Sequence, residues 1–411
     1  MKDVPRELEE VVDAVLAYRP QNTQRQRPRG YDMAFGYKHY VPILKGKAGE
    51  LDALAKTPPK SRTKFTPLVE VPPIPPSWPD DSDEPVPSRK IDQHVNSVVT
   101  AFKKSLPGFA SVWVDGFYIE TEDALEDGSS PIDVLFAGLR DAGIDFVPVV
   151  GLDRVKDYIQ SVQSAVELDG RGCCIRLVES DLEGIADLEK QVTSLLKELG
   201  VKSKTVDLLV DFASQVPSKS ALPYQIDDLP LLSEWRTLTV ASSAFPIDLS
   251  GLKTNSVTEL DRQDWLVWTS LPSHKKGVKR MPSYGDYAIN HPTITEIDPR
   301  IMQMSPNIRY SGPQTFVIAK GQAIPRKPKK GVTDFAAQEK KREALLPAVQ
   351  YPKLADAVMK HSAWKGNDFS WGDKFIADCA QKEAVGNATT WRTVGTSHHI
   401  ALVVQQIASL P

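Results

Sequence analysis

Charged side chains interrupt several short apolar runs of this 411-residue chain, and their burial is costly unless each finds a partner. The three clearest are Glu70 in PLVEVPP, Arg176 in CIRLV and Asp211 in LLVDFAS. Asp115 in SVWVDGFYI and Lys45, directly after YVPIL, are of the same kind. Carboxylates that converge with a lysine and an arginine can bind a metal, exchange protons with a substrate or hold a phosphate. The same residues can instead form an internal ion-pair network, and the sequence leaves both interpretations open.

A second candidate lies near the C-terminus, where His398 and His399 stand side by side in TWRTVGTSHHIALVVQQIASLP. Neighbouring positions on a helix point about 100° apart, so the two imidazoles are poorly placed to share one metal. No H-E-x-x-H motif, cysteine cluster or G-x-S-x-G elbow accompanies them. Thr396 or Ser397 can cap a helix that begins at about residue 398. We therefore expect one histidine to face the functional site and the other to be structural.

Composition places the chain among ordinary globular proteins with a sizeable core. Hydrophobic residues make up 41% and charged residues 25%, and a net charge of −3 gives no global attraction to nucleic acid or membranes. Basic residues cluster at 274–280 and 326–330, where solvated loops are favoured over phosphate-binding surfaces. No apolar run approaches ~18 residues, so we expect no membrane span. Three cysteines without metal or disulfide spacing suit a reducing compartment, which predicts a cytoplasmic location.

Short apolar runs alternate with helical patterns from residue 40 onward. Eight runs predict strands, at 40–44, 65–71, 111–119, 145–151, 172–178, 206–212, 236–243 and 264–271. Helical patterns lie between them, at 48–56, 91–106, 130–143, 153–169, 180–200 and, interrupted by glycine, 248–263. Ser130 is the expected N-cap of the third helix, with Pro131 at its first position and Gly143 past its end. The alternation predicts an α/β fold, a (β/α)8 TIM-like barrel with a C-terminal α+β extension. An open doubly wound sheet is the alternative, but no Gly-rich nucleotide-binding loop supports it.

Three segments follow from this pattern: an N-terminal helical extension at 1–36, the barrel at 37–280 and a C-terminal elaboration at 281–411. In the last of these, 307–322 predicts a hairpin around Gly312 and Pro313, followed by a charged helix within 333–349 and a closing helix. The segment 72–90 is rich in Pro, Asp and Ser and is expected to be an exposed loop rather than a regular element. Because it follows the second strand, it would lie over the functional face of a barrel.

A barrel would bring the charged residues together, because the active sites of such barrels lie at the C-terminal ends of the strands. The catalytic candidates are then Glu70, Asp115, Asp211 and His399, the last as a proton donor. The ligand-binding candidates at the same end are Lys45 and Arg176, which suit a small phosphate-bearing ligand. The sequence contains no recognised cofactor-binding motif, and it leaves open whether a metal is bound.

Several phrases spread along the chain resemble the beta protein family of phages and bacteria. They are YVPILKGKAGELDAL, TPLVEVPP, YGDYAINHP, NIRY, FSWGDKFI and WRTVGTSHHI, and together they cover roughly residues 39–410. The founding member of that family comes from a satellite phage and protects its host from a toxic partner called Gop. The resemblance therefore implies a role in phage–host conflict, as an immunity, antitoxin-like or defence component with a toxin or phage protein as partner. It implies no catalytic activity.

The matching phrases add ligand-binding candidates, namely Lys47, Tyr287, Arg309, Tyr310, Trp391, Arg392 and His398. The aromatic and arginine residues among them are types that anchor interfaces or stack on planar ligands. For Trp391, as for Trp371, we favour packing of the C-terminal segment against the barrel.

Three functions remain as hypotheses. The first is a binding protein of phage–host conflict, and the second is a hydrolase of phosphodiesters or nucleotides that uses a metal or acid–base chemistry. The third, a nucleic-acid binder acting through the two basic loops, is disfavoured by the net charge. Geometry separates the first two hypotheses. Convergence of Lys45, Glu70, Asp211, Arg309 and His399 on one open pocket would favour an enzyme or ligand site, whereas mutual burial and pairing would favour a binding protein.

Overall fold

The computed structural model describes residues 34–410 except 123, 274–276, 296–297, 299 and 329–332. The helix expected within 1–36 therefore lies almost wholly outside the described residues, as do parts of both basic loops. Residues 34–411 belong to one compact unit that includes the barrel and the C-terminal segment.

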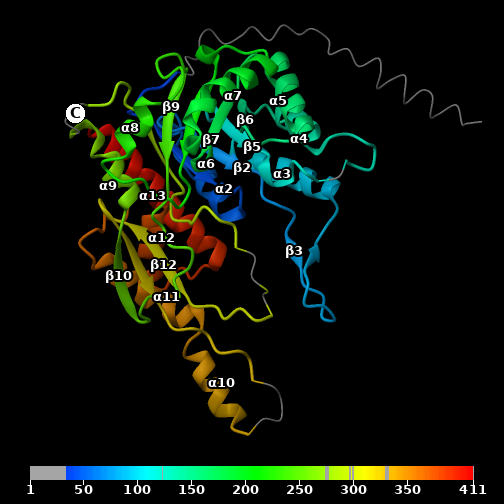
Figure 1. Cartoon of the computed structure of the whole chain (residues 1–411). Helices are drawn as coiled ribbons and strands as arrows, with labels where there is room; N and C mark the ends of the chain where they lie inside the picture. The colour runs from blue at the N-terminus through cyan, green and yellow to red at the C-terminus, as the bar shows by residue number, and fades with distance from the viewer. Residues whose placement is uncertain are drawn as a thin grey trace, which may run out of the picture. The chain divides into compact units, whose positions relative to one another are not determined.

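Eight parallel strands close into a barrel, as predicted, and helices lie around its outside (Figure 1). The order around the barrel is β1-β11-β9-β8-β7-β6-β5-β2. The strands are β1 Tyr40–Leu44, β2 Leu68–Glu70, β5 Val112–Asp115, β6 Phe146–Val150, β7 Cys174–Val178, β8 Asp207–Asp211, β9 Thr237–Ala241 and β11 Ser283–Asp286. Nearly all of their residues are buried, because each faces either the barrel interior or the surrounding helices, and this explains the continuous apolar runs.

The helices of the barrel region follow most of the predicted patterns. They are α2 Ala48–Ala55, α3 Ile91–Ser105, α4 Pro131–Asp141, α5 Lys156–Asp169, α6 Glu179–Glu183, α7 Ile185–Glu198, α8 Leu222–Asp227 and α9 Gln263–Trp268. Short 3-10 turns lie at Pro59–Ser61, Phe117–Ile119, Ser203–Thr205 and Leu271–Ser273. As predicted, Ser130 caps α4: its hydroxyl accepts from the backbone N–H groups of Ile132 and Asp133, and Pro131 is the first helical residue. Among the described residues, no helix is both long enough and apolar enough to cross a membrane.

The prediction of an eighth strand at 264–271 is wrong. Helix α9 forms there, and β11 closes the barrel beyond residue 280. Trp265 and Trp268 lie three positions apart on α9, so both rings pack against Tyr284 of β11. Periodicity alone does not distinguish a short apolar strand from a buried helix of the same length.

The actual closing strand, β11, has a weak sequence signal because SYGD is short, polar and contains a glycine. A Cβ at Gly285 would lie 2.8 Å from the Cβ of Ala241 and 3.0 Å from the carbonyl oxygen of Val41. The glycine therefore permits a close approach of three neighbouring strands. Closure of the barrel, rather than strand propensity, accounts for this element.

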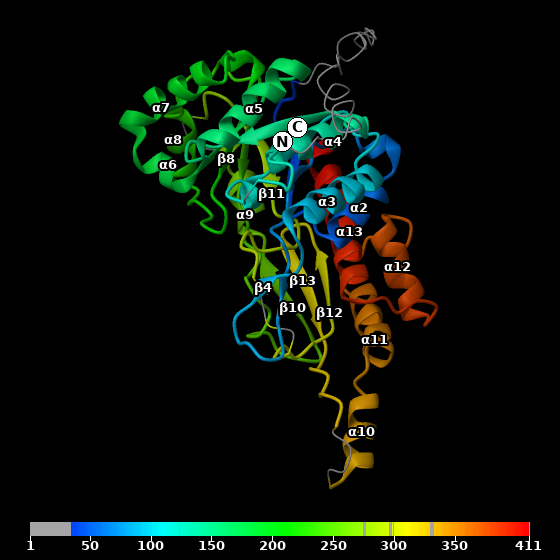
Figure 2. The ribbon, with the colours of Figure 1, turned by 90° about the vertical axis from the view of Figure 1, so that its right-hand side faces the viewer.

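An antiparallel sheet in the order β10-β13-β12 adjoins the barrel (Figure 2). Its strands are β10 Ser256–Asp261, β12 Asn307–Ser311 and β13 Thr315–Lys320. The hairpin of β12 and β13 around Gly312 and Pro313 is confirmed. In contrast, β10 occupies part of 248–263, where a helix was predicted, and this prediction is wrong. Asn255, directly before β10, has a φ of 53°, a left-handed conformation that does not continue a helix, and β10 pairs along its full length with β13.

Four helices complete the chain: α10 Phe335–Glu343, α11 Pro347–Met359, α12 Trp371–Ala380 and α13 Ala388–Ala408. The last of these begins at Ala388 rather than at about 398. The side chain of Asn387 caps it by accepting from the backbone N–H of Thr390, so Thr396 and Ser397 are interior residues and not caps. Helix α13 contacts α2, α12, β12 and β1, and so joins the C-terminal segment to the barrel (Figure 2).

The segment 72–90 is largely exposed beyond its first residues, but it is not wholly irregular. Strands β3 Pro76–Ser77 and β4 Val86–Pro87 pair antiparallel within it, contrary to the expectation that it holds no regular element. Arg300 donates to the carbonyl oxygens of Pro79 at 2.6 Å and Ser82 at 3.0 Å. These bonds connect the segment to the loop before β12.

Candidate functional site

The C-terminal ends of the barrel strands surround a cavity of about 350 Å3, which we call the mouth cavity. Its charged lining is Lys45, Glu70, Asp153, Arg154, Arg176 and Asp211. Phe117, Tyr118 and Tyr287 add aromatic surface. Asp115 lies directly behind this lining and is fully buried. The barrel therefore brings together the charged residues that interrupt the apolar runs, as expected from their positions at strand ends.

Arg176 of β7 is the centre of this charge network. Its Nη1 lies 2.9 Å from Oε1 of Glu70 and 2.7 Å from Oδ2 of Asp115. Its Nη2 donates to Oδ2 of Asp211 at 2.6 Å and to the hydroxyl of Tyr287 at 2.9 Å. Tyr287 donates in turn to the same Asp211 oxygen at 2.5 Å. One guanidinium thereby connects four other strand ends.

Opposite charges hold Arg176 and Asp115 in their ionised forms. Burial alone would lower the pKa of Arg176, but the surrounding hydroxyl and carboxylates raise it well above the usual arginine value. Burial would raise the pKa of Asp115, but the charges of Arg154 and Arg176 outweigh that effect and lower it. These groups are therefore fixed charges at neutral pH rather than groups ready to exchange a proton.

Lys45 is tied to the same network. Its Nζ lies 2.5 Å from Oε2 of Glu70 and donates to the hydroxyl of Tyr118 at 3.4 Å. It also lies over the ring of Tyr287, 4.9 Å from the ring centroid. The ammonium group is thus bound to one carboxylate and one aromatic face.

Arg154 was not predicted, yet it has donors that the network does not use. Its Nη2 donates to both oxygens of Asp115, at 3.1 and 3.2 Å, and its guanidinium lies 4.6 Å from the ring centroid of Phe117. Its Nε and Nη1 are buried without a hydrogen-bond partner in the described part of the chain. The carboxylate of Glu120 comes no closer to Nη1 than 3.7 Å. Arg154 lies four positions past the end of β6, so a search for polar residues somewhat beyond each strand end would have found it.

A guanidinium occupies the place between the three carboxylates that were candidates for holding a metal or transferring protons. Glu70, Asp115 and Asp211 each place an oxygen within 2.9 Å of Arg176. Across the described residues, no group of three or more His, Cys, Asp or Glu side chains is arranged to hold a metal ion.

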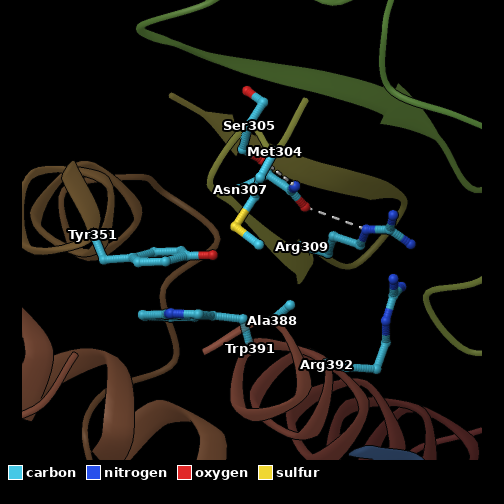
Figure 3. A pocket seen from close by; sticks show the side chains of 8 residues that line it. All are labelled: Met304, Ser305, Asn307, Arg309, Tyr351, Ala388, Trp391 and Arg392. Atoms are coloured by element: carbon cyan, nitrogen blue, oxygen red, sulfur yellow. Dashed lines mark hydrogen bonds between the residues drawn. The ribbon is translucent and has the colours of Figure 1, made fainter. Parts of the chain in front are cut away.

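A second cavity, of about 210 Å3, adjoins the mouth cavity and shares Lys45 with it. Arg309 of β12 and Arg392 of α13 line it together with Lys47 and Glu50 from the start of α2, and we call it the arginine hollow. The same two arginines also line a smaller cavity of about 90 Å3, in which their guanidinium groups lie near each other (Figure 3).

Two other candidates have packing roles. The ring of Trp391 stacks on that of Tyr351 with centroids 4.4 Å apart, and its indole N–H donates to the carbonyl oxygen of Val385. Trp391 therefore packs within the C-terminal segment and not, as was expected, against the barrel. Tyr310 is fully buried, donates to Asp373 at 2.8 Å and is absent from the lining of both cavities.

Both histidines of the C-terminal pair are fully buried in α13. The ring nitrogens of His398 lie 2.9 Å from Asp373 and 2.8 Å from the carbonyl oxygen of Ser311. Those of His399 lie 2.8 Å from Asp286 and 2.7 Å from the hydroxyl of Ser311. The expectation that one imidazole faces the barrel mouth is wrong, because each is held at both nitrogens by the packing of α13. As helix geometry predicted, they point to different carboxylates.

The five residues chosen to separate an enzyme from a binding protein do not share one pocket. Lys45, Glu70 and Asp211 meet at the mouth cavity and are buried, Lys45 being paired with Glu70 and Asp211 with Arg176. Arg309 belongs to the neighbouring cavity and His399 to the interior. This geometry combines an open cavity with a fixed charge network.

Comparison with protein families gives a match over most of the chain. The family model described as Beta protein matches residues 40–405, a range that contains the whole barrel, the C-terminal sheet and most of α13. No curated protein matches the chain.

Proposed function

The chain belongs to the Beta protein family, and from that premise we propose that it acts in the conflict between phages and their bacterial hosts. In this proposal it is an immunity, antitoxin-like or defence protein that works by binding a small ligand or a partner at its barrel mouth. The observation that supports this most directly is the mouth cavity itself, where Arg154 offers donors that no described residue uses.

The electrostatics of the cavity favour binding over turnover. General acid–base catalysis works best with a group whose pKa lies near the working pH. At Asp115, however, Arg154 and Arg176 hold the pKa below its ordinary value despite complete burial. Such a network stabilises a fixed shape and presents oriented donors and acceptors to whatever enters.

The lining indicates the chemistry of the ligand. Arg154 can donate to a hydrogen-bond acceptor of the ligand, and Oε2 of Glu70, which besides its ion pair with Lys45 accepts no hydrogen bond in the described part of the chain, can accept from a donor. Phe117 is 41% exposed and, with Tyr118, offers an aromatic face. A small polar molecule with hydroxyl or amino groups and a flat ring, of the nucleoside class, matches this lining better than a simple anion.

Exposed apolar side chains in the segment before β12 offer a contact surface for a partner protein. Ile301, Met302 and Met304 expose 70%, 47% and 43% of their surface in one short segment. Arg300 joins that segment to the 72–90 loop. Exposed apolar side chains grouped in this way are typical of interaction sites.

The proposal is tested by expressing the wild type and Arg154→Gln in bacteria and measuring the plating efficiency of infecting phages. We expect the wild type to change plating, and Arg154→Gln to weaken that change roughly tenfold or more, as loss of a charged hydrogen bond to a ligand would. Arg171→Gln is the matched control, since Arg171 forms a half-exposed ion pair with Asp145 before β7. If Arg154→Gln acts like the wild type while it is folded and expressed equally, the mouth cavity is not the functional site.

Hydrolysis of a phosphodiester or nucleotide is the second candidate, because Glu70 and Asp211 lie on the cavity at the ends of their strands. Purified protein is incubated with nucleotides and a dinucleotide, and products are separated by chromatography. Turnover by the wild type that is lost in both Glu70→Gln and Asp211→Asn would replace the binding proposal with this one. Phage plating unchanged by both substitutions would eliminate the hydrolase.

A further inference from the structure

The arginine hollow holds more positive than negative charge. Lys45 is paired with Glu70 at 2.5 Å, and among the described residues that line the hollow Glu50 supplies the one carboxylate beside Arg309 and Arg392. Glu50 is 2% exposed and accepts from the side-chain amide of Asn290 at 2.7 Å.

Among the described residues, no carboxylate oxygen lies within 4.0 Å of a nitrogen of either arginine of the hollow. The cations of the ion pairs elsewhere in the chain do have a carboxylate at such a distance. Arg309 donates from Nη1 to the carbonyl oxygen of Ile289 at 2.9 Å and from Nε to the Asn307 amide oxygen at 3.4 Å. Arg392 donates from Nη1 to the Asn290 amide oxygen. The Nη2 group of each arginine has no acceptor in the described part of the chain, and both groups end at the same cavity (Figure 3).

Two half-buried guanidinium groups that lie near each other repel each other. Burial and the charge of Arg392 lower the pKa of Arg309 well below its usual range. Burial lowers the pKa of Arg392 as well, although Glu50 opposes the effect. Arginine does not give up its proton at accessible pH, so an anion is the remaining way to relieve the repulsion.

We propose that Arg309 and Arg392, with Lys47 at the edge, form a binding site for the phosphate group of a small ligand. The excess of positive charge in the hollow matches the double negative charge of a phosphate monoester better than the single charge of a carboxylate. Two planar guanidinium forks can each present paired N–H groups to phosphate oxygens. The inference goes beyond the proposed function, because the site holds a phosphate whether or not the mouth cavity is occupied.

The mouth cavity is less suited to a phosphate than the arginine hollow. In the mouth every cation already contacts a carboxylate, so an entering phosphate would meet anions as well as cations. The phosphate therefore binds at Arg309 and Arg392 and not at Lys45 and Arg176, where the sequence analysis expected it. Lys45 borders both cavities, so a ligand bound by its phosphate in the hollow can extend toward the mouth.

The test is isothermal titration of the full chain in a buffer free of phosphate and sulfate, with inorganic phosphate, ribose 5-phosphate and adenosine monophosphate as probes. We expect at least one probe to bind, and both Arg309→Gln and Arg392→Gln to weaken it roughly tenfold or more. Arg309→Lys keeps the charge but loses the fork, and an intermediate affinity is expected. Arg171→Gln is the control for loss of one positive charge elsewhere.

The three probes distinguish the sources of the phosphate. Equal affinity for all three identifies a site for the phosphate alone, and tighter binding of one organic ester identifies a ligand that uses the adjoining surface. Absence of binding for all three at 10 mM, roughly the weakest useful range, overturns the inference. So does unchanged affinity in folded Arg309→Gln and Arg392→Gln, or a loss caused by Arg154→Gln instead, which would place the phosphate in the mouth.

Discussion

The mouth cavity and the arginine hollow lie next to each other and share Lys45, yet they balance charge in opposite ways. In the mouth each cation meets a carboxylate, as in the contacts of Lys45 with Glu70 at 2.5 Å and of Arg176 with Asp211 at 2.6 Å. In the hollow the guanidinium groups of Arg309 and Arg392 contact only neutral oxygens among the described residues. Matched charges are typical of a positioned framework, whereas an unmatched excess indicates a place for a ligand.

A third buried cluster, beneath α13, has the opposite excess. Asp264 and Asp286 share it with Arg262 and with the imidazole of His399, whose pKa burial lowers. Burial and the charge of Asp286 raise the pKa of Asp264 to about 6. A surplus carboxylate can take up a proton, but a surplus guanidinium cannot release one. The hollow therefore needs an external anion to balance its charge. The cluster beneath α13 can balance its own charge by taking up a proton.

The largest effect is expected from Arg176→Met. This substitution removes the cation between Glu70, Asp115 and Asp211 and leaves buried carboxylates without their central partner. Breaking a buried ion pair in this way costs about 3–5 kcal/mol of unfolding free energy. Urea unfolding of the purified variant measures it. A loss below about 1 kcal/mol would show that the mouth charges are solvated and would remove the contrast with the hollow.

The second effect concerns pH and the cluster beneath α13. The folded pKa of Asp264 is raised above its unfolded value of 3.8, so folding favours the protonated form and this stabilisation is lost as pH rises from about 4 to about 6. Asp264→Asn stays neutral throughout, and its amide oxygen can still accept from Tyr284. Relative to the wild type, the variant should gain about 2–3 kcal/mol between pH 4 and pH 7. Urea unfolding at both pH values measures the difference, and a pH-independent gap would contradict it.

The sequence predicted the framework of the mouth better than the hollow, for a physical reason. A charged residue inside a buried strand, such as Arg176 or Asp211, stands out against its apolar neighbours, and barrel geometry then places it at the mouth. The hollow combines Lys47, Asn290, Arg309 and Arg392, which come from four separate parts of the chain. None of them interrupts an apolar run. The two arginines became candidates only through the resemblance to a family, and no spacing in the sequence indicated that they lie close together.

The errors of the sequence analysis have a common cause as well. The eighth strand was placed on the tryptophan-rich run of α9 instead of on SYGD, because side-chain pattern is a poor guide to a strand that exists through barrel closure. The C-terminal histidines were given a possible role at the mouth because burial by α13 cannot be read from two adjacent residues. In both cases tertiary packing outweighed the local signal.

The third effect tests the residue that borders both cavities. Lys45→Met removes the partner of Glu70, but Glu70 keeps the guanidinium of Arg176 at 2.9 Å. We therefore expect a loss of about 2 kcal/mol, less than the loss for Arg176→Met, because Glu70 keeps one of its two cationic partners. Thermal and urea unfolding measure it alongside that variant. A loss equal to that of Arg176→Met would mean that Glu70 depends on Lys45 for its compensation.

The smallest loss of unfolding free energy is expected from Arg309→Met. A small loss would show that Arg309, unlike the cations of the mouth, is not required for stability. The substitution removes two hydrogen bonds, to the carbonyl oxygen of Ile289 and, at 3.4 Å, to the amide oxygen of Asn307. It keeps an apolar stem next to Phe245, over whose ring the guanidinium lies at 4.7 Å. It also removes the repulsion between Arg309 and Arg392, which offsets the lost bonds. Without phosphate, the unfolding free energy should change by less than about 1 kcal/mol.

With phosphate at a hundred times its dissociation constant, the wild type should gain about 2.7 kcal/mol and the variant much less. Urea unfolding with and without phosphate measures both numbers. A loss near that of Arg176→Met in the absence of phosphate would mean that Arg309 is a structural cation like those of the mouth, and the two cavities would then differ only in position.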